Sequence, residues 1–83
     1  MQFKILLQTV NDVKEVANIA GSIPEQVNVV IKSGTYIVDA KSLMGIFSLN
    51  LSDPVTIEMS SSYAVNYDYY KSLFKKWICV GEE

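Results

Sequence analysis

The chain alternates between two hydrophobic periods, and this alternation constrains its fold more than any other feature. Apolar residues at every second position are typical of half-buried strands, whereas apolar residues at i, i+3, i+4 and i+7 are typical of helices that cover a core. Strand-like segments occur at residues 2–9, 26–33, 35–40 and 55–59. Helical segments occur within residues 11–20, 40–51 and 64–78. The sequence therefore predicts the order β-α-β-β-α-β-α.

The strand-like segments also indicate which side of the sheet faces the core. Their inward positions are apolar and comprise Phe3, Ile5, Leu7, Val27, Val29, Ile31, Val55, Ile57 and Met59. Their outward positions include the polar residues Lys4, Gln8, Asn28, Lys32, Thr56 and Glu58. In residues 35–40 either alternate set contains an apolar residue, so the inward side of this strand stays open. We predict an α+β fold, an open-faced two-layer β-sandwich whose four-stranded antiparallel sheet is covered on one face by three helices.

Short polar residues and glycines mark the expected ends of these elements. We expect Asn11 to cap the first helix and Gly21 to end it. Gly34 would supply the backbone freedom for a hairpin. Ser42 precedes a short apolar run, where its hydroxyl would accept a hydrogen bond from a free N–H of the first helical turn. Gly45 would let this second helix lie close to a neighbour, although a helical Gly costs about 1 kcal/mol relative to Ala.

Length and charge limit the class of protein. At 83 residues the chain is expected to form one domain, residues 1–83. Seven basic and nine acidic residues give a net charge of −2, which argues against a nucleic-acid or anionic-membrane surface. The apolar runs are shorter than the roughly 20 residues that span a bilayer, and the N-terminus lacks a signal-peptide pattern. We therefore expect a cytoplasmic protein that binds neither nucleic acid nor membrane.

The lack of histidine restricts the chemistry of the chain. With no His and one Cys, there is no Cys-His zinc site and no Ser-His pair for acyl transfer. Cys79 has no internal disulfide partner, and packing on the last helix is favoured over a redox role. Asp12 and Glu15 lie one helical turn apart and could bind a cation, but a solvated helix face is favoured. We expect no enzyme activity, no metal and no cofactor.

The last helical segment is rich in aromatic residues. Its predicted apolar stripe comprises Ala64, Tyr67, Tyr70, Phe74, Trp77 and Ile78. Tyrosine and tryptophan rings can stack on nucleic-acid bases, but the accompanying Lys71, Lys75 and Lys76 are too few for a nucleic-acid groove. We expect the stripe to close the core.

Residues 40–51 carry the most specific signal. They read A-K-S-L-M-G-I-F-S-L-N-L, and K-S-L-M-G followed by I-F-S-L resembles the second helix of HPr, the small phosphocarrier of the bacterial sugar phosphotransferase system. The chain is also similar to the HPr family in length and in the predicted order of elements. The resemblance implies an HPr-like fold and a role in carbon metabolism.

The resemblance does not extend to the phosphocarrier site. HPr accepts a phosphoryl group on a histidine just before its first helix, within a pattern like G-I-H-A-R-P-A. The corresponding loop here is Q-T-V-N-D-V, residues 8–13, and it lacks the histidine, the arginine and the proline. Asp12 occupies the place where the family presents a phosphate. The chain is therefore expected to be a regulatory protein, similar to the histidine-lacking Crh-like paralogues, and not a phosphocarrier.

A second family site is retained in the sequence. In HPr of low-GC Gram-positive bacteria and in Crh-like proteins, a serine in this K-S-[IL]-M-G context is phosphorylated by an ATP-dependent HPr kinase, and the product is a corepressor for a sugar-responsive transcription factor. Ser42 matches that serine and is the candidate phosphorylation site. The candidate partner-binding residues around it are Lys41, Leu43, Met44, Ile46 and Phe47. Two alternatives stay open: Ser42 is only a helix cap, or the chain is a non-phosphorylated protein-interaction module that retains only the fold.

Overall fold

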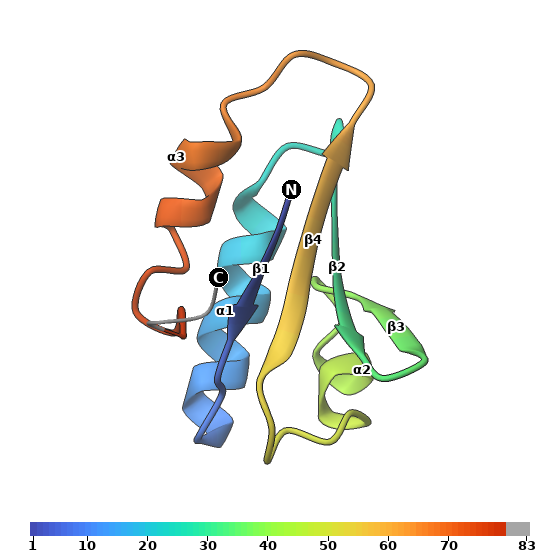
Figure 1. Ribbon diagram of the computed structural model, residues 1–83, viewed down its shortest axis with the longest axis vertical. Helices are drawn as coiled ribbons and strands as arrows, with labels where there is room; N and C mark the ends of the chain where they lie inside the picture. Colours follow the sequence, from blue (N-terminus) through green and yellow to red (C-terminus); the bar gives the residue numbers. More distant parts are fainter. Residues whose placement is uncertain (80–83) are drawn as a thin grey trace.

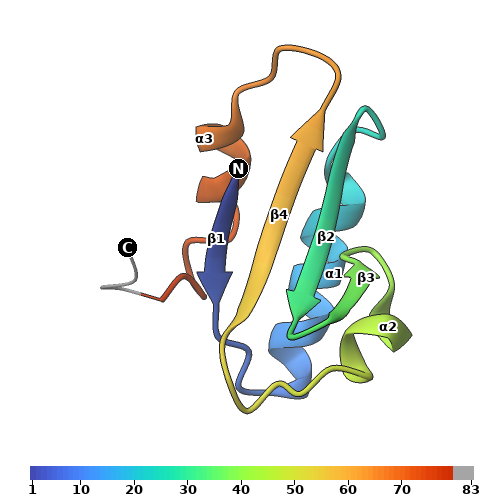
Figure 2. The same ribbon diagram turned by 45° about the vertical axis from the view of Figure 1, so that its right-hand side comes forward.

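The sheet is four-stranded, wholly antiparallel and ordered β1-β4-β2-β3 in the computed structural model, which describes residues 1–79 (Figures 1 and 2). The strands are β1 (Gln2–Ile5), β2 (Val27–Ser33), β3 (Tyr36–Asp39) and β4 (Val55–Ser61). The helices are α1 (Val10–Ser22), α2 (Leu43–Phe47) and α3 (Tyr67–Ser72). The predicted α+β fold and the order β-α-β-β-α-β-α are confirmed.

The core lies between the sheet and the helices. Its buried side chains from the strands and the segments that continue them are Phe3, Ile5, Leu7, Val27, Val29, Ile31, Ala40, Val55, Ile57 and Met59. From the helical side it receives Val13, Val16, Ala20, Ile23, Ile46, Leu49, Phe74 and Trp77. The alternation predicted for the first, second and fourth strands is therefore confirmed, because each inward position that it assigned is buried.

The opposite face of the sheet is polar and open to water. Lys4 and Asn28 are exposed there, while Thr56 and Glu58 are half-buried. Lys32 and Glu58 lie on neighbouring strands and form an ion pair of 2.6 Å. This ion pair lowers the pKa of the Glu58 carboxyl. An open face of this kind is what a two-layer sandwich requires.

Helix α1 begins and ends outside its predicted limits. Thr9, not Asn11, is the N-cap: its hydroxyl accepts the Asp12 N–H, and Asp12 in turn accepts the Thr9 N–H, which is a capping box. Asn11 lies inside the helix. Gly21 does not end the helix, which continues to Ser22 before the buried Ile23.

The C-terminal segment is less helical than its apolar stripe predicts. Helix α3 has six residues, after which turns bring Phe74 and Trp77 into the core. Ala64 is exposed and does not belong to the buried stripe. Turns can bury a large ring as effectively as a helix, so the spacing of the aromatic residues identified the core but overstated the helix.

Strand β3 is the most exposed part of the sheet. It pairs only with β2, through a two-residue turn whose Gly34 has a φ of 60°, as a type II′ turn requires. Tyr36 and Ile37 are both exposed, and Val38 is half-buried. The register settles the open question about its inward side. Val38 lies opposite the buried Ile31 and packs against the core, so Tyr36 and Val38 form the inward set, although Tyr36 is exposed at the end of this edge strand.

Candidate functional site

Ser42 caps helix α2 with its side chain. Its Oγ accepts a hydrogen bond of 3.1 Å from the Gly45 N–H, and its carbonyl accepts the Ile46 N–H at 3.0 Å. Its backbone is extended, with φ −93° and ψ 101°, as is usual for an N-cap. The residue is exposed. The predicted cap is therefore confirmed, while phosphorylation of Ser42 stays a prediction.

Gly45 explains why this short helix holds its place beside β3. A Cβ at this position would lie 3.0 Å from the Ser42 Oγ and 3.2 Å from the Val38 Cβ. Both distances are shorter than ordinary van der Waals contact. The predicted close approach is confirmed, since glycine lets α2 pack on β3 while the Ser42 cap stays intact.

The charges next to Ser42 are one lysine and one carboxylate. The Lys41 Nζ lies 3.6 Å from the Asp39 Oδ1, and the same oxygen accepts the Lys41 backbone N–H at 2.8 Å. The Asp39 carbonyl accepts the Ser42 N–H at 2.9 Å. Asp39 thus organises the turn into α2 and also partly balances the positive charge nearest Ser42.

The apolar candidates of α2 divide between surface and core. Met44 is 80% exposed and Phe47 is 41% exposed. Leu43 is half-buried against the core. Ile46 is fully buried, so its assignment as a partner-binding residue is wrong. A five-residue helix has one inward face, and Ile46 occupies it.

A shallow groove of about 400 Å³ separates α2 from the start of α1. Its lining residues are Leu7, Gln8, Thr9, Val10, Val13, Phe47, Leu51 and Ser52. Val10 is strongly exposed at the beginning of α1. The sequence does not single out Val10, because the predicted cap at Asn11 places Val10 in a loop. The groove, Met44 and Phe47 together form what we call the α1–α2 surface.

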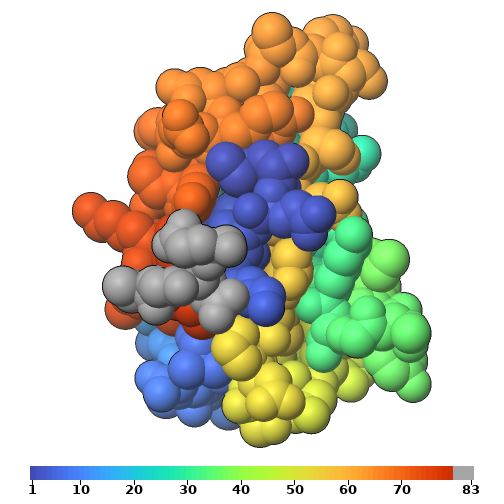
Figure 3. All heavy atoms as spheres, viewed as in Figure 1, coloured from blue at the N-terminus to red at the C-terminus, as the bar shows by residue number. Residues whose placement is uncertain are grey.

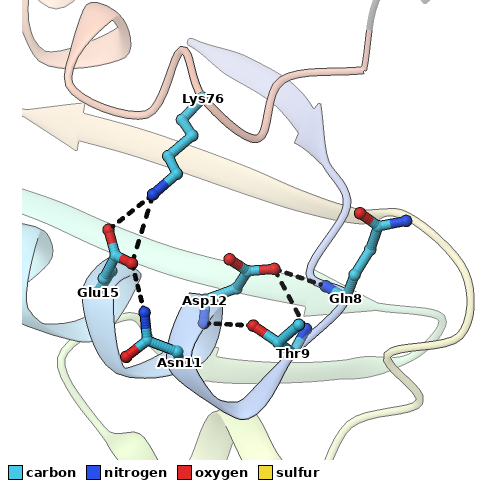
Figure 4. Close-up of polar contacts among 6 residues, drawn as sticks. All are labelled: Gln8, Thr9, Asn11, Asp12, Glu15 and Lys76. Carbon is cyan, nitrogen blue, oxygen red and sulfur yellow. Dashed lines mark hydrogen bonds and ion pairs between the residues drawn. The ribbon is translucent and has the colours of Figure 1, made fainter.

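The loop before α1 is closed by its own hydrogen bonds. The Asp12 Oδ2 accepts the N–H groups of Gln8 at 3.0 Å and of Thr9 at 3.1 Å (Figure 4). The buried Trp77 indole lies beside Asp12, although among the described residues its N–H completes no hydrogen bond. The indole, followed by the Gln8 and Thr9 donors, lowers the pKa of the Asp12 carboxyl. These contacts hold an ionised carboxylate at the beginning of α1.

Glu15 makes contacts separate from those of Asp12. Its carboxylate accepts a hydrogen bond of 2.7 Å from Asn11 and pairs with the Lys76 Nζ at 3.1 Å (Figure 4). Within residues 1–79, no group of three or more His, Cys, Asp or Glu is placed to hold a metal ion. The two acidic side chains serve a helix cap and an ion pair, in keeping with the solvated-face interpretation.

Comparisons with known proteins leave the resemblance as a hypothesis. No protein-family model matches the chain, and no curated protein matches it at the significance threshold. In the part of the chain that the structure describes, none of the helices has the length and apolar character needed to span a membrane.

Proposed function

We propose that this chain is an HPr-like regulatory protein of bacterial carbon metabolism. In this proposal it is cytoplasmic, has no enzyme activity, and is switched in its binding to protein partners by phosphorylation of Ser42. The observation that carries the proposal is the exposed Ser42 hydroxyl at the N-cap of α2, beside the exposed Met44. The resemblance of residues 40–51 to HPr and the order of the elements add support.

A phosphate on Ser42 would change the α1–α2 surface more than the core. The phosphorylated side chain carries a charge of about −1.5 to −2, and Ser42 is exposed, so the phosphate can extend into solvent. The adjacent Lys41 contacts Asp39, and the phosphate would compete with Asp39 for it. The expected result is a folded protein with a new anionic group next to Met44.

The same geometry argues against a carrier function. Transfer of phosphate between proteins in this system uses a histidine nitrogen, and the chain has no histidine. The loop that would present the phosphate is filled by Asp12 and its hydrogen bonds. A phosphate in this loop would be repelled by the Asp12 carboxylate. Of the two roles known in the HPr family, we therefore propose that this chain retains only regulation at Ser42.

Incubation with ATP and an HPr kinase, followed by intact-mass measurement, tests the proposal. We expect one phosphoryl group on the wild-type protein and on Ser48→Ala, and none on Ser42→Ala. Ser48 is a matched control, because it lies at the other end of α2 and its hydroxyl bonds the Gly45 carbonyl. A wild-type protein left unmodified by a kinase that phosphorylates a control HPr would refute the proposal.

The second candidate function is a non-phosphorylated interaction module. It is favoured by the groove of the α1–α2 surface, whose exposed Val10 and Phe47 would serve docking without any modification. The two candidates differ in one result. For a module of this kind Ser42→Asp would leave partner affinity unchanged, whereas for a phosphorylation switch the same substitution would alter it.

A further inference from the structure

The two edges of the sheet differ in what covers them. Backbone groups of residues 77–79 close the β1 edge: the Leu6 N–H donates to the Trp77 carbonyl at 2.9 Å, and the Cys79 N–H donates to the Lys4 carbonyl at 3.0 Å. Strand β3 lies at the other end of the strand order, and no strand within residues 1–79 pairs with its outer side. Figure 1 shows β3 at the right-hand side of the molecule, beside α2. The chain protects one edge and leaves the other open.

The hydrogen-bond pattern of the β2–β3 ladder identifies the outward backbone groups. The Ala40 N–H donates to the Val29 carbonyl at 3.0 Å. Hydrogen-bonded pairs alternate along an antiparallel ladder, so Ile37 and Asp39 occupy the positions whose N–H groups point away from β2. These N–H groups are available to an additional strand.

The side chains of β3 do not discourage such pairing. Natural edge strands are protected by short length, charged side chains, proline, a bulge or a covering element. Strand β3 is short and ends in Asp39, but its first three side chains carry no charge. Strand β3 reads Tyr-Ile-Val-Asp, and its exposed fractions are 72% for Tyr36 and 61% for Ile37. In the space-filling view the β2–β3 hairpin, in green, projects from the right-hand side of the molecule (Figure 3).

We propose that β3 pairs with β3 of a second copy of this chain. The two strands would run antiparallel about a two-fold axis at Ile37, which would join the two sheets into one. This proposal does not depend on the function proposed for Ser42. It goes beyond that function by assigning a self-association surface to the β3 edge, where no strand within the described residues pairs with β3 on its outer side.

The sequence of β3 is self-complementary in this register. Each Ile37 faces the other Ile37, and each Tyr36 faces Val38 of the second copy, so every central cross-strand pair is apolar. The two Asp39 carboxylates lie at opposite ends of the paired strands. A parallel arrangement would place the two carboxylates side by side. An antiparallel shift by two residues would place Ile37 against Asp39 in one direction and against Thr35 in the other. The register centred on Ile37 is therefore favoured, because it pairs Ile37 with an apolar residue.

The size of the contact predicts a weak dimer. Four-residue strands with a few flanking side chains bury less than the roughly 1,200 Å² at the lower limit of stable specific interfaces. In a two-fold symmetric dimer each substitution is present in both copies, so it changes the interface twice. Self-association should therefore depend on protein concentration and respond strongly to a single change at Ile37.

Sedimentation equilibrium of the full chain over a concentration series tests this inference. We expect reversible dimers of the wild-type protein, and a dissociation constant raised about tenfold or more in Ile37→Lys, because the substitution replaces an apolar pair by two like charges. Val10→Lys is the matched control, because Val10 is similarly exposed but lies at the start of α1; it should dimerise like the wild type.

A charge-complementation experiment tests the register itself. Ile37→Lys and Ile37→Glu should each be monomeric alone, and an equal mixture of the two should dimerise, because residue 37 would then face an opposite charge. Circular dichroism would establish that both variants fold. The proposal is overturned if the wild type stays monomeric at millimolar concentration, if Ile37→Lys dimerises as well as the wild type, or if the mixture shows no recovery.

Discussion

The Ser42 oxygen that caps α2 is also the oxygen that the proposed phosphorylation would modify. In the unmodified chain that oxygen accepts the Gly45 N–H and so fixes the beginning of α2. In the proposed phosphorylated form it would carry the phosphate, whose oxygens could take over the hydrogen bond to the helix. A cap position therefore tolerates modification better than a buried hydroxyl. Stability measurements test the cap alone, and only phosphorylation and partner-binding measurements test the switch.

Replacement of Ser42 tests the cap. Ser42→Ala should lower the free energy of unfolding by about 1 kcal/mol, because the Gly45 N–H loses its acceptor. Ser42→Asp should be nearly neutral, because aspartate also caps helices. Urea denaturation measures both changes. Ser62→Ala, an exposed position in the loop after β4, is the control and should change stability by less than about 0.5 kcal/mol.

Two glycines in helices should respond oppositely to alanine. Gly21→Ala in α1 should stabilise the fold by about 0.5–1 kcal/mol, because its Cβ would meet no atom within 4 Å and alanine favours the helix. Gly45→Ala should destabilise the fold, because its Cβ would crowd both the Ser42 Oγ and the Val38 Cβ. Thermal unfolding of the two variants provides the comparison. Stabilisation by Gly45→Ala would contradict the close packing of α2 on β3.

At the scale of an element, α1 depends on the ionised Asp12. The pKa of Asp12 is lowered in the folded chain from the ordinary 3.8, so this contribution to stability is complete above pH 3.8 and is lost as the pH falls through the lower value. Glu58 acts in the same direction, because its pKa is lowered from 4.5. Acid should therefore destabilise the fold from about pH 4 downward.

The substitution Asp12→Asn isolates the contribution of the α1 cap. The variant should unfold at a lower temperature than the wild type at neutral pH, because an amide is a weaker acceptor for the Gln8 and Thr9 N–H groups. The two unfolding temperatures should converge at low pH, where Asp12 itself becomes neutral. A constant difference across the pH range would indicate that packing, and not charge, is responsible.

Element ends were harder to predict than the elements themselves. Asn11 and Thr9 are both acceptable caps, and only the reciprocal bond from Asp12 distinguishes them, because the capping box joins Thr9 to the residue three positions on. The length of α3 was overestimated because Phe74 and Trp77 keep helical spacing while they lie in turns. Tyr36 and Ile37 are exposed because β3 is an edge strand. The order of the strands in the sheet cannot be predicted from the local pattern of apolar residues.

At the scale of the whole molecule, periodicity was sufficient for the architecture. Period-two segments placed Ile5, Val29 and Ile57 in one core, and the sheet could bury them only under helices. Among the candidate site residues, Ser42, Met44 and Phe47 are exposed and Ile46 is buried, while Val10 was not a candidate. A short motif gives residue types, but the side of a five-residue helix that faces a partner depends on packing.

The absence of histidine gives a further prediction for the intact protein. It should accept no phosphate from phosphoenolpyruvate through the enzyme that charges HPr, because neither Thr9 nor Asn11 provides a nitrogen nucleophile for this transfer. Labelling followed by acid treatment would check this, since a phosphohistidine-type bond is acid-labile. HPr run in parallel controls for the activity of the enzyme.

The central claim is that this chain is phosphorylated at Ser42 as a regulatory modification and does not transfer phosphoryl groups between proteins. The most direct measurement is intact mass after parallel incubations with two donors, ATP with an HPr kinase and phosphoenolpyruvate with the HPr-charging enzyme. We predict one phosphoryl group from the ATP reaction, absent in Ser42→Ala, and none from the phosphoenolpyruvate reaction. An unmodified protein in the ATP reaction, or an acid-labile phosphoryl group from phosphoenolpyruvate, would contradict this account.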